Sequence, residues 1–270
     1  MISFPNAKIN LGLDIIEKRN DGYHNISSCF YPIKLTDILE IIESNKFSFS
    51  STGFTIPGQN KDNLVIKAYQ LLKKDFDLPE VAIHLHKSIP TGAGLGGGSA
   101  DGAFTLKMLN TLFELYLDDT ILIDYASTLG SDCPFFIYNL PMIVEGRGDL
   151  IRPCDLKLKG YYLFIIKPDF AISTSEAYQE VIPIYPENSI EEILDNPSPE
   201  TWKDILKNDF ETGLFKKNPE LKEIKKQLFK HGALYASLTG SGAAIFGIFR
   251  EDPVMGAVFP KMYFTWQGKL

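Results

Sequence analysis

Five glycines fall within the seven residues from Gly92 to Gly98, and no other segment of the sequence offers chemistry as clearly. Glycine loses much backbone entropy on folding, so this density indicates unusual dihedral angles or a close approach of the backbone to another group. A helical pattern follows from Ser99. Its free N–H groups and the positive end of its dipole would face the loop, which predicts an anion site suited to polyphosphate.

This loop has three other interpretations. Gly92, Gly94 and Gly97 satisfy the dinucleotide-binding pattern G-x-G-x-x-G, with acids at a suitable distance at Asp118 and Asp119. In that fold the acid ends a second parallel strand, whereas here it interrupts two helical patterns. A Walker A loop needs a lysine after its last glycine, and none is present. The third alternative is a tight loop with a structural role only, since short motifs are unreliable alone.

Two charged residues stand in otherwise apolar surroundings. Lys8 lies in the apolar strand pattern of residues 7–16, and Asp132 lies between Gly130 and the apolar run 134–136. Taken singly, such a lysine is typical of an edge strand and such an aspartate of an Asx turn or a helix cap. Phosphoryl transfer, however, needs charge neutralisation and a base for the hydroxyl proton. Together these side chains are candidates for both tasks.

Strands and helices both contribute to positioning these residues, which predicts an α+β protein. Strands are expected over residues 7–16, 28–35, 38–42, 81–86, 161–167, 234–237 and 244–249. Helices are expected over residues 63–74, 99–115, 120–129 and 221–230. Residues 183–199 are rich in proline and acids and predict a surface excursion. A composition break near Pro153 predicts two lobes, residues 1–153 and 154–270.

Charge and cysteine usage limit the classes of partner and the compartment. The net charge of −7 argues against a nucleic-acid or anionic-membrane binder, because both call for a basic surface. Three scattered cysteines suit a reducing cytosol better than a disulfide framework. Neither a signal peptide nor an apolar run of about 20 residues is evident, so we expect a cytoplasmic protein. The sequence gives no indication of oligomeric state.

His84 and His86 are two residues apart on a predicted strand, so both imidazoles would face one side. Such a pair could begin a metal site. No third ligand is evident in the sequence, however, so both are interpreted as solvent-facing strand residues and no protein metal ligand is predicted.

The loop resembles the phosphate loop of the GHMP kinase superfamily in its long form, Pro-x-x-x-Gly-Leu-Gly-Gly-Gly-Ser over residues 90–99. The resemblance implies ATP and Mg²⁺ as cofactors and a two-lobed GHMP kinase fold. The implied ATP-binding residues are Asn63, Pro90, Gly92, Ala93, Gly94, Leu95, Gly96, Gly97, Gly98 and Ser99. One departure is Ala100, where these kinases usually carry a second serine. Any role of that hydroxyl would fall to Ser99 or to water.

The two charged residues also match motifs of that superfamily. Residues 5–11 resemble P-x-A-K-x-N-L, and residues 130–135 resemble G-(S/A)-D-x-P-F. The resemblance implies that Asp132 is the general base on the acceptor hydroxyl and that Lys8 orients and stabilises it. The glycine turn of residues 238–242 resembles the third motif of the superfamily, which is placed beside the active site.

The acceptor is indicated by residues 19–24, which resemble the R-x-D-G-Y-H signature of the diphosphocytidyl-methylerythritol kinases. A hairpin turn without a binding role would be the alternative for this segment taken alone. Residues 168–178 resemble a second segment of these kinases. The resemblance implies His24 on the cytosine edge, Tyr23 in the same pocket and Tyr178 stacked on the base. Asn10 and Thr174 complete the implied substrate-binding set.

The expected function is transfer of the ATP γ-phosphoryl group to the 2-hydroxyl of a diphosphocytidyl-methylerythritol, in non-mevalonate isoprenoid precursor synthesis. The partner would be this small cytidyl-diphosphate molecule, with neither nucleic acid nor membrane. Three alternatives remain at this point. They are a GHMP-type kinase for another small alcohol, a nucleotide-binding protein that keeps the fold without turnover, and an NAD-dependent oxidoreductase.

Overall fold

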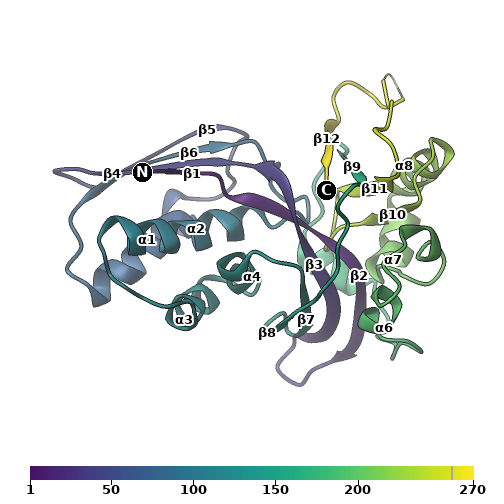
Figure 1. Cartoon of the computed structure of the whole chain (residues 1–270), viewed down its shortest axis with the longest axis horizontal. Helices are drawn as coiled ribbons and strands as arrows, with labels where there is room; N and C mark the ends of the chain where they lie inside the picture. The colour runs from purple at the N-terminus through teal and green to yellow at the C-terminus, as the bar shows by residue number, and fades with distance from the viewer. Residues whose placement is uncertain (257) are drawn as a thin grey trace. The chain divides into compact units, whose positions relative to one another are not determined.

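The structure is a computed structural model that describes residues 1–256 and 258–270 (Figure 1). The chain forms two compact units, each assembled from separate stretches of sequence. Unit 1 comprises residues 1–7, 35–91 and 96–140, and unit 2 comprises residues 8–34, 92–95 and 141–270. The chain therefore passes from one unit to the other within strands and within the glycine loop. The predicted domain boundary near Pro153 stays a prediction.

Unit 1 is a four-stranded sheet with four helices. Its strands are β1 (Ile2–Ser3), β4 (Ile38–Glu43), β5 (Ser48–Gly53) and β6 (Val81–Lys87), in the order β1-β4-β6-β5. Its helices are α1 (Leu64–Asp75), α2 (Gly97–Leu112), α3 (Asp119–Leu129) and α4 (Cys133–Tyr138), with the short 3₁₀ helix η1 (Asn60–Asp62). Alternate residues of β6 are buried, and α2 packs against α1, α3 and α4. This alternation is what one covered sheet face requires.

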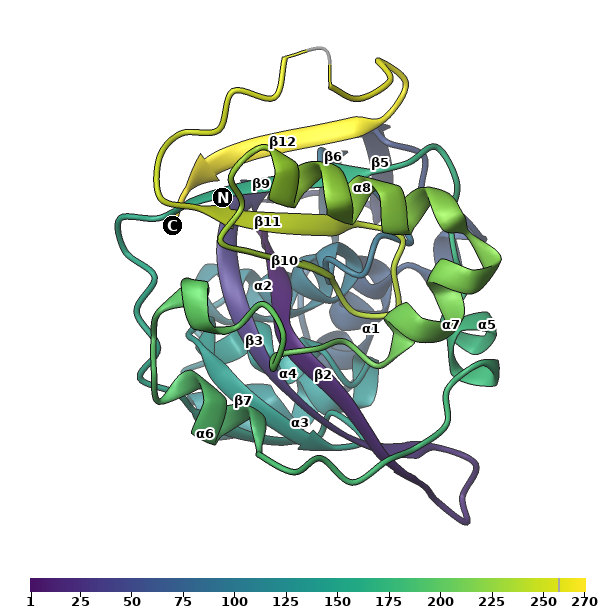
Figure 2. The same cartoon turned by 90° about the vertical axis from the view of Figure 1, so that its right-hand side faces the viewer.

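Unit 2 holds two further four-stranded sheets. The first contains β2 (Asn6–Lys18), β3 (His24–Thr36), β7 (Met142–Gly146) and β8 (Leu150–Pro153), in that order. The second has the order β10-β11-β9-β12, with β9 (Tyr162–Lys167), β10 (Tyr235–Leu238), β11 (Ile245–Phe249) and β12 (Phe264–Lys269). The helices are α5 (Thr174–Gln179), α6 (Ile190–Leu194), α7 (Phe210–Lys217) and α8 (Pro219–Lys230), with the 3₁₀ helix η2 (Pro199–Thr201). Figure 2 shows α8 lying along the second sheet, and its Leu221, Ile224 and Leu228 enter the core.

Most of the predicted elements are confirmed, and the differences have local causes. Helix α2 begins at Gly97 instead of Ser99 because two glycines enter its first turn. It ends at Leu112 instead of residue 115 because the Asn110 side chain binds both backbone groups of Leu117. Residues 183–199 are not wholly irregular, since a capping box starts α6 within them. None of the helices in the described residues is long and apolar enough to cross a membrane.

A buried ion cluster ties the strand before the glycine loop to the helix after it. Lys87 ends β6, and its ammonium group binds Asp37 and, at 2.6 Å, Asp101 of α2. All three residues are at most 3% exposed. Asp37 also accepts the backbone N–H groups of Ser88 and Ile89 at 2.6 and 2.8 Å. The two residues that lead into the loop are therefore held by the same carboxylate that pairs with Lys87.

This cluster holds two carboxylates against a single ammonium group. Burial raises the pKa of Asp101, the Lys87 charge opposes this, and the Asp37 charge adds to it, so that the net pKa is about 8. Burial lowers the pKa of Lys87, but the two carboxylates raise it above its ordinary value. One carboxyl oxygen of Asp101 is buried without a hydrogen-bond partner. The folded protein therefore favours the protonated acid at this position.

Replacing Asp101 by asparagine should change how stability depends on pH. The folded state keeps the Asp101 proton up to pH about 8, whereas the unfolded chain loses it near pH 4. The contribution of this proton to the stability of the folded state is therefore lost as the pH rises between those values. The free energy of unfolding of the parent chain should thus fall relative to Asp101→Asn, by at most about 1.4 kcal/mol per pH unit. Urea unfolding between pH 5 and 8 measures the difference.

Asp118→Asn is the matched control for this prediction. Asp118 caps α3 at the surface, and hydrogen bonds from Thr120 and Ile121 lower its pKa. The ionisation of Asp118 therefore affects the free energy of unfolding only at more acid pH. Its stability curve should run parallel to that of the parent chain over this range. Parallel curves for the parent chain and Asp101→Asn would contradict the assignment of the proton.

Candidate active site

The glycine loop combines left-handed backbone with a helix start that no side chain caps. Gly92, Gly94 and Gly96 have φ values of +63°, +74° and +72°. Gly96 is the N-cap of α2 and no side chain accepts from the first turn. A Cβ atom at Gly98 would meet nothing within 4 Å, so there is open space beside this turn. The backbone N–H groups of the helix start are thus accessible to an anion, as a phosphate site requires.

Lys8 is buried in unit 2 rather than exposed on an edge strand. It is 2% exposed, and its Nζ donates to Asn10 Oδ1 at 2.5 Å and lies 4.4 Å from the ring centroid of Phe30. Asn10 Nδ2 in turn donates to Ser28 Oγ at 2.9 Å. The Lys8 backbone N–H donates to the carbonyl of Leu95 in the glycine loop at 2.9 Å. The structure therefore brings two predicted site residues, Lys8 and Asn10, to the loop segment of unit 2.

Thr239 connects this strand to the glycine loop. Its hydroxyl accepts the Asn10 backbone N–H at 3.2 Å and lies 3.2 Å from Asn10 Oδ1 and 3.1 Å from the Gly94 carbonyl, toward both of which it can donate. A Cβ atom at Gly94 would lie 2.0 Å from the Thr239 carbonyl, so only glycine fits there. Thr239 belongs to the third glycine motif but was not predicted as a site residue. The motif itself was the signal that pointed to it.

Asp132 and Ser99 belong to unit 1, where they flank the same thiol. Asp132 is the N-cap residue of α4, and the next residue, Cys133, is buried. Burial raises the pKa of Cys133 to about 12; a hydrogen bond from Ser99 opposes the rise and the Asp132 charge adds to it. Ala100 is fully buried. The methyl group that replaces the usual serine hydroxyl therefore packs in the interior, and Ser99, half-buried, is the hydroxyl closer to the surface.

Two further predicted ATP-binding residues, Asn63 on the adenine side and Pro90 of the phosphate loop, are in unit 1. Asn63 is half-buried and caps α1, because its Oδ1 accepts the N–H of Val65 at 2.9 Å. Pro90 is buried directly before the glycine loop. Asn63 thus has a structural role that the sequence did not predict, while its predicted nucleotide contact stays a prediction.

The hairpin between β2 and β3 presents the predicted base-recognition residues. Arg19 N–H donates to the Tyr23 carbonyl at 2.8 Å, and the Arg19 guanidinium pairs with Asp21 at 3.0 Å, which closes the turn. Tyr23 is 60% exposed, and the Arg147 guanidinium lies 5.3 Å from its ring centroid. The next residue, His24, begins β3. The arginine and aspartate of this motif therefore shape the turn, in which Gly22 has a φ of +85°.

His24 and Tyr178 are far apart in sequence and lie together in unit 2. Their ring centroids are 4.6 Å apart with an interplanar angle of 20°, which is a stacked arrangement. Tyr178 also meets Phe210 edge to face at 4.9 Å. Burial lowers the pKa of His24 and the charge of Lys18 lowers it further, so the imidazole is neutral at pH 7. A neutral imidazole offers one donor and one acceptor, which suits a base edge.

Thr174, the last of the predicted substrate-binding residues, starts α5. Its hydroxyl lies 3.2 Å from that of Ser241 in the third glycine motif. The predicted residues Lys8, Asn10, Gly94, Leu95 and Thr174 are thus all linked by hydrogen bonds to β2 or to this motif. The roles assigned to the individual residues stay predictions.

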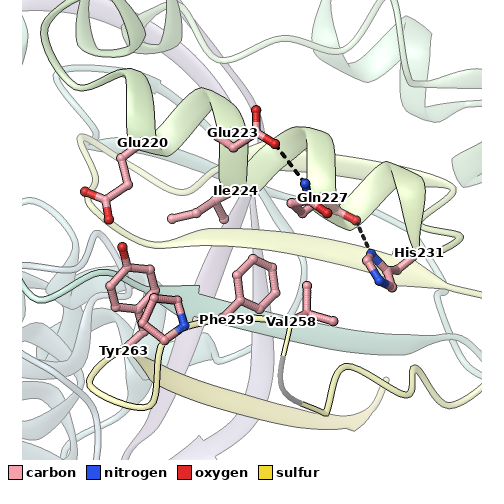
Figure 3. A pocket seen from close by; sticks show the side chains of 9 residues that line it. Glu220, Glu223, Ile224, Gln227, His231, Val258, Phe259 and Tyr263 are labelled. Atoms are coloured by element: carbon pink, nitrogen blue, oxygen red, sulfur yellow. Dashed lines mark hydrogen bonds between the residues drawn. The ribbon is translucent and has the colours of Figure 1, made fainter.

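A separate groove of unit 2 contains none of the predicted residues. It has a volume of about 430 Å³ and lies between α8 and the segment around Phe259 and Tyr263 (Figure 3). Its polar groups are largely engaged along α8, since Gln227 binds both Glu223 and His231 at 2.8 Å. Three of the polar residues that line this groove are therefore engaged with one another.

Among the described residues, no group of three or more His, Cys, Asp or Glu side chains could hold a metal ion. His84 and His86, predicted to face solvent, are half-buried and bind Ser50 and Thr52 of β5, a strand that the sequence analysis missed. Mg²⁺ in phosphoryl-transfer enzymes rests mainly on substrate phosphates and water, with one or two side-chain oxygens. The Ser99 hydroxyl is an oxygen donor of the kind that fits such an ion.

Two sequence profiles of one protein family match the chain. Residues 63–139 match the GHMP kinases N terminal domain, and residues 190–262 match the GHMP kinases C terminal domain. The chain is 50% identical over 274 residues to a 4-diphosphocytidyl-2-C-methyl-D-erythritol kinase of Bacteroides fragilis, with 100% of both chains covered. It is 53% identical over 256 residues to the protein of the same name from Bacteroides thetaiotaomicron, with 93% of each covered.

Solved structures agree with the sequence relatives. A crystal structure of a 4-(cytidine 5'-diphospho)-2C-methyl-D-erythritol kinase superposes with a TM-score of 0.79 at 32% identity, covering 92% of this chain and 90% of that one. The mevalonate kinase of Methanococcus jannaschii superposes with a TM-score of 0.70 at 16% identity, covering 100% and 98%, which shows a shared fold. These findings confirm the predicted α+β GHMP kinase fold and the predicted kinase activity. The chain belongs to the GHMP kinase family and, within it, to the 4-diphosphocytidyl-2-C-methyl-D-erythritol kinases.

Proposed function

We propose that this chain transfers the γ-phosphoryl group of ATP to the 2-hydroxyl of 4-diphosphocytidyl-2-C-methyl-D-erythritol. The observation that carries the proposal is the buried Lys8–Asn10 pair, linked through Thr239 to the glycine loop. This links an ammonium group to a backbone suited to phosphate, as phosphoryl transfer requires. The names of the relatives at about half identity over the full chain support the acceptor.

In this proposal the glycine loop and the start of α2 hold the ATP phosphates. The uncapped N–H groups of α2 would donate to phosphate oxygens, and the helix dipole would favour their negative charge. Asn63 would contact the adenine side. Mg²⁺, when bound, would supply positive charge to the phosphates, and the Ser99 hydroxyl would be a side-chain oxygen available to it.

The chemical step needs only one proton acceptor. As the acceptor 2-hydroxyl oxygen forms its bond to the γ-phosphorus, the bond from that phosphorus to the bridging β–γ oxygen breaks and ADP leaves. Asp132 would take the hydroxyl proton, and the Lys8 ammonium would orient this carboxylate and offset the charge on the transferred group. Burial of Lys8 beside Asn10 keeps the ammonium in one orientation.

The cytidine end of the acceptor would be recognised at the His24–Tyr178 pair. Stacking on such an aromatic platform is worth about 1–3 kcal/mol per base, and the neutral imidazole can bond to the base edge. Tyr23 would close the pocket from the hairpin. A small-molecule substrate and a net charge of −7 fit a cytoplasmic enzyme with no nucleic-acid or membrane partner.

Replacing Asp132 by asparagine should lower kcat at least about 100-fold, because a positioned base contributes about 10²–10⁴ in rate. ATP affinity, measured by calorimetry, should change little since the phosphate loop is intact. ADP release with Mg-ATP and the cytidyl acceptor measures kcat. Asp124→Asn, an exposed change on α3, is the control and should keep full activity. Near-normal turnover of Asp132→Asn would remove Asp132 from the role of base.

Replacing Tyr178 by leucine should raise the KM for the cytidyl acceptor about 5- to 150-fold, the equivalent of the lost stacking. The KM for ATP should be unchanged. Tyr185→Leu, at an 80% exposed tyrosine, is the control for Tyr178→Leu. An equal rise in both KM values for Tyr178→Leu would argue against a cytidine platform.

The parent chain should also show a rise in the KM for the cytidyl acceptor as the pH falls through the lowered pKa of His24, because the imidazolium no longer accepts a hydrogen bond.

A further inference from the structure

The carboxamide of Asn208 is buried and uses all of its hydrogen-bonding groups. Asn208 is 2% exposed and lies two residues before α7. Its Nδ2 donates to the carbonyls of Leu238 and Gly240 at 2.9 and 3.0 Å, and its Oδ1 accepts the N–H of Phe210 at 3.0 Å. Two donors and one acceptor are therefore required at one place. Among the side chains of this size, only asparagine supplies them.

The backbone on both sides of Asn208 is fixed to β2. Leu13 N–H donates to the Lys207 carbonyl at 2.8 Å, and Asp209 N–H donates to the Leu13 carbonyl at 2.9 Å. Leu13 lies on the same strand as Lys8. The side chain of Asn208 therefore extends from a base anchored to the strand that carries the buried ammonium.

The two carbonyls that Asn208 holds belong to the residues on either side of Thr239. Both peptide neighbours of Thr239 are fixed in this way, which sets the direction of its side chain. The Thr239 hydroxyl then reaches Asn10 and the Gly94 carbonyl. Asn208 is thus linked, through the backbone and the hydroxyl of Thr239, to the hydrogen-bond partner of Lys8 and to the glycine loop.

We infer that Asn208 is a positioning residue for phosphoryl transfer, acting through Thr239 on Asn10 and on Gly94. The inference rests on the proposed function, because it assigns Asn208 to the geometry of the proposed site. Asn208 touches neither substrate in this scheme. Loss of its donors would leave two buried carbonyls unsatisfied and free the turn to move, and a displacement of about 1 Å at a reacting centre can lower the rate about 100-fold.

The test is a double-mutant cycle between Asn208→Asp and Thr239→Val. Asn208→Asp keeps the shape but replaces the two donors by acceptors, and Thr239→Val removes only the hydroxyl. Each variant should lower kcat about 10- to 100-fold. Here kcat is calculated per ATP-binding site, with the concentration of these sites measured by calorimetry. Because both changes break one path, the double variant should be no slower than the slower single variant. Losses in kcat that multiply would overturn the inference.

Asn110→Asp is the matched control, since Asn110 clamps a loop of unit 1 in the same way, with bonds of 3.0 and 2.9 Å to Leu117. It should lower thermal stability and leave kcat per ATP-binding site unchanged. A comparable loss of kcat in Asn110→Asp would show that general destabilisation explains the effect of Asn208→Asp, and would overturn the inference.

Hydrogen exchange separates this inference from the proposed function. The N–H of Ala244 donates to the Ala93 carbonyl at 3.2 Å and that of Lys8 to Leu95. Asn208→Asp should speed exchange at both amides, and Asn110→Asp at neither. If the parent chain failed to phosphorylate the cytidyl acceptor, the proposed acceptor would be wrong while this measurement still applied. Unchanged exchange in Asn208→Asp would overturn the inference whatever the kinetics.

Discussion

A lysine ammonium group that is removed from water must be surrounded by groups that compensate it, and much of unit 2 meets this requirement at Lys8. The amide oxygen of Asn10 accepts from it, and the ring of Phe30 covers it. Asn10 can keep this orientation because its Nδ2 donates to Ser28 Oγ and its backbone N–H donates to the Thr239 hydroxyl. The first ten residues of β2 are all buried or nearly so. A strand covered on both faces holds its polar side chains rigidly, and this rigidity is what a catalytic ammonium needs.

The two units supply different parts of the predicted site. Unit 1 contains the start of α2, Ser99 and Asp132, together with the Lys87 cluster that joins the end of β6 to α2. Unit 2 contains Lys8, His24 and Tyr178, together with the first half of the loop. Within unit 2, Asn10 and Tyr178 are held by Ser28 and Phe210, which have no predicted role in the reaction. Rotational freedom is therefore removed before any ligand arrives, which lowers the entropy lost on reaching a reactive geometry.

The parts of the site that are local in sequence could be predicted, and those that depend on distant pairing could not. The composition of the glycine loop alone indicated a site, whereas Lys8 and Asp132 became candidates through the motifs that their neighbours in sequence match. Helix α2 was placed two residues late because glycine at a helix start has the composition of a loop. Asn208 lies in no unusual run, and its partners are 30 and 32 residues away. The third member of the Lys87 cluster, Asp37, lies 50 residues from that lysine, and a single sequence carries no signal for such a contact.

The interleaving of the two units in sequence has a consequence for synthesis of the protein. The strand that carries Lys8 is synthesised first, but Asn10 can form its hydrogen bonds with Thr239 only after a further 229 residues have been added. A ribosome adding about 5–20 residues per second would leave the buried lysine without its hydrogen-bond network for about 10 to 50 seconds. During that interval the apolar residues of β2, which are buried in the folded protein, are exposed, and the strand can pair with other chains. A chain that stops before β10 has the phosphate loop and the proposed base, but it lacks Thr239 and therefore the hydrogen bonds from this residue to Asn10 and to the Gly94 carbonyl.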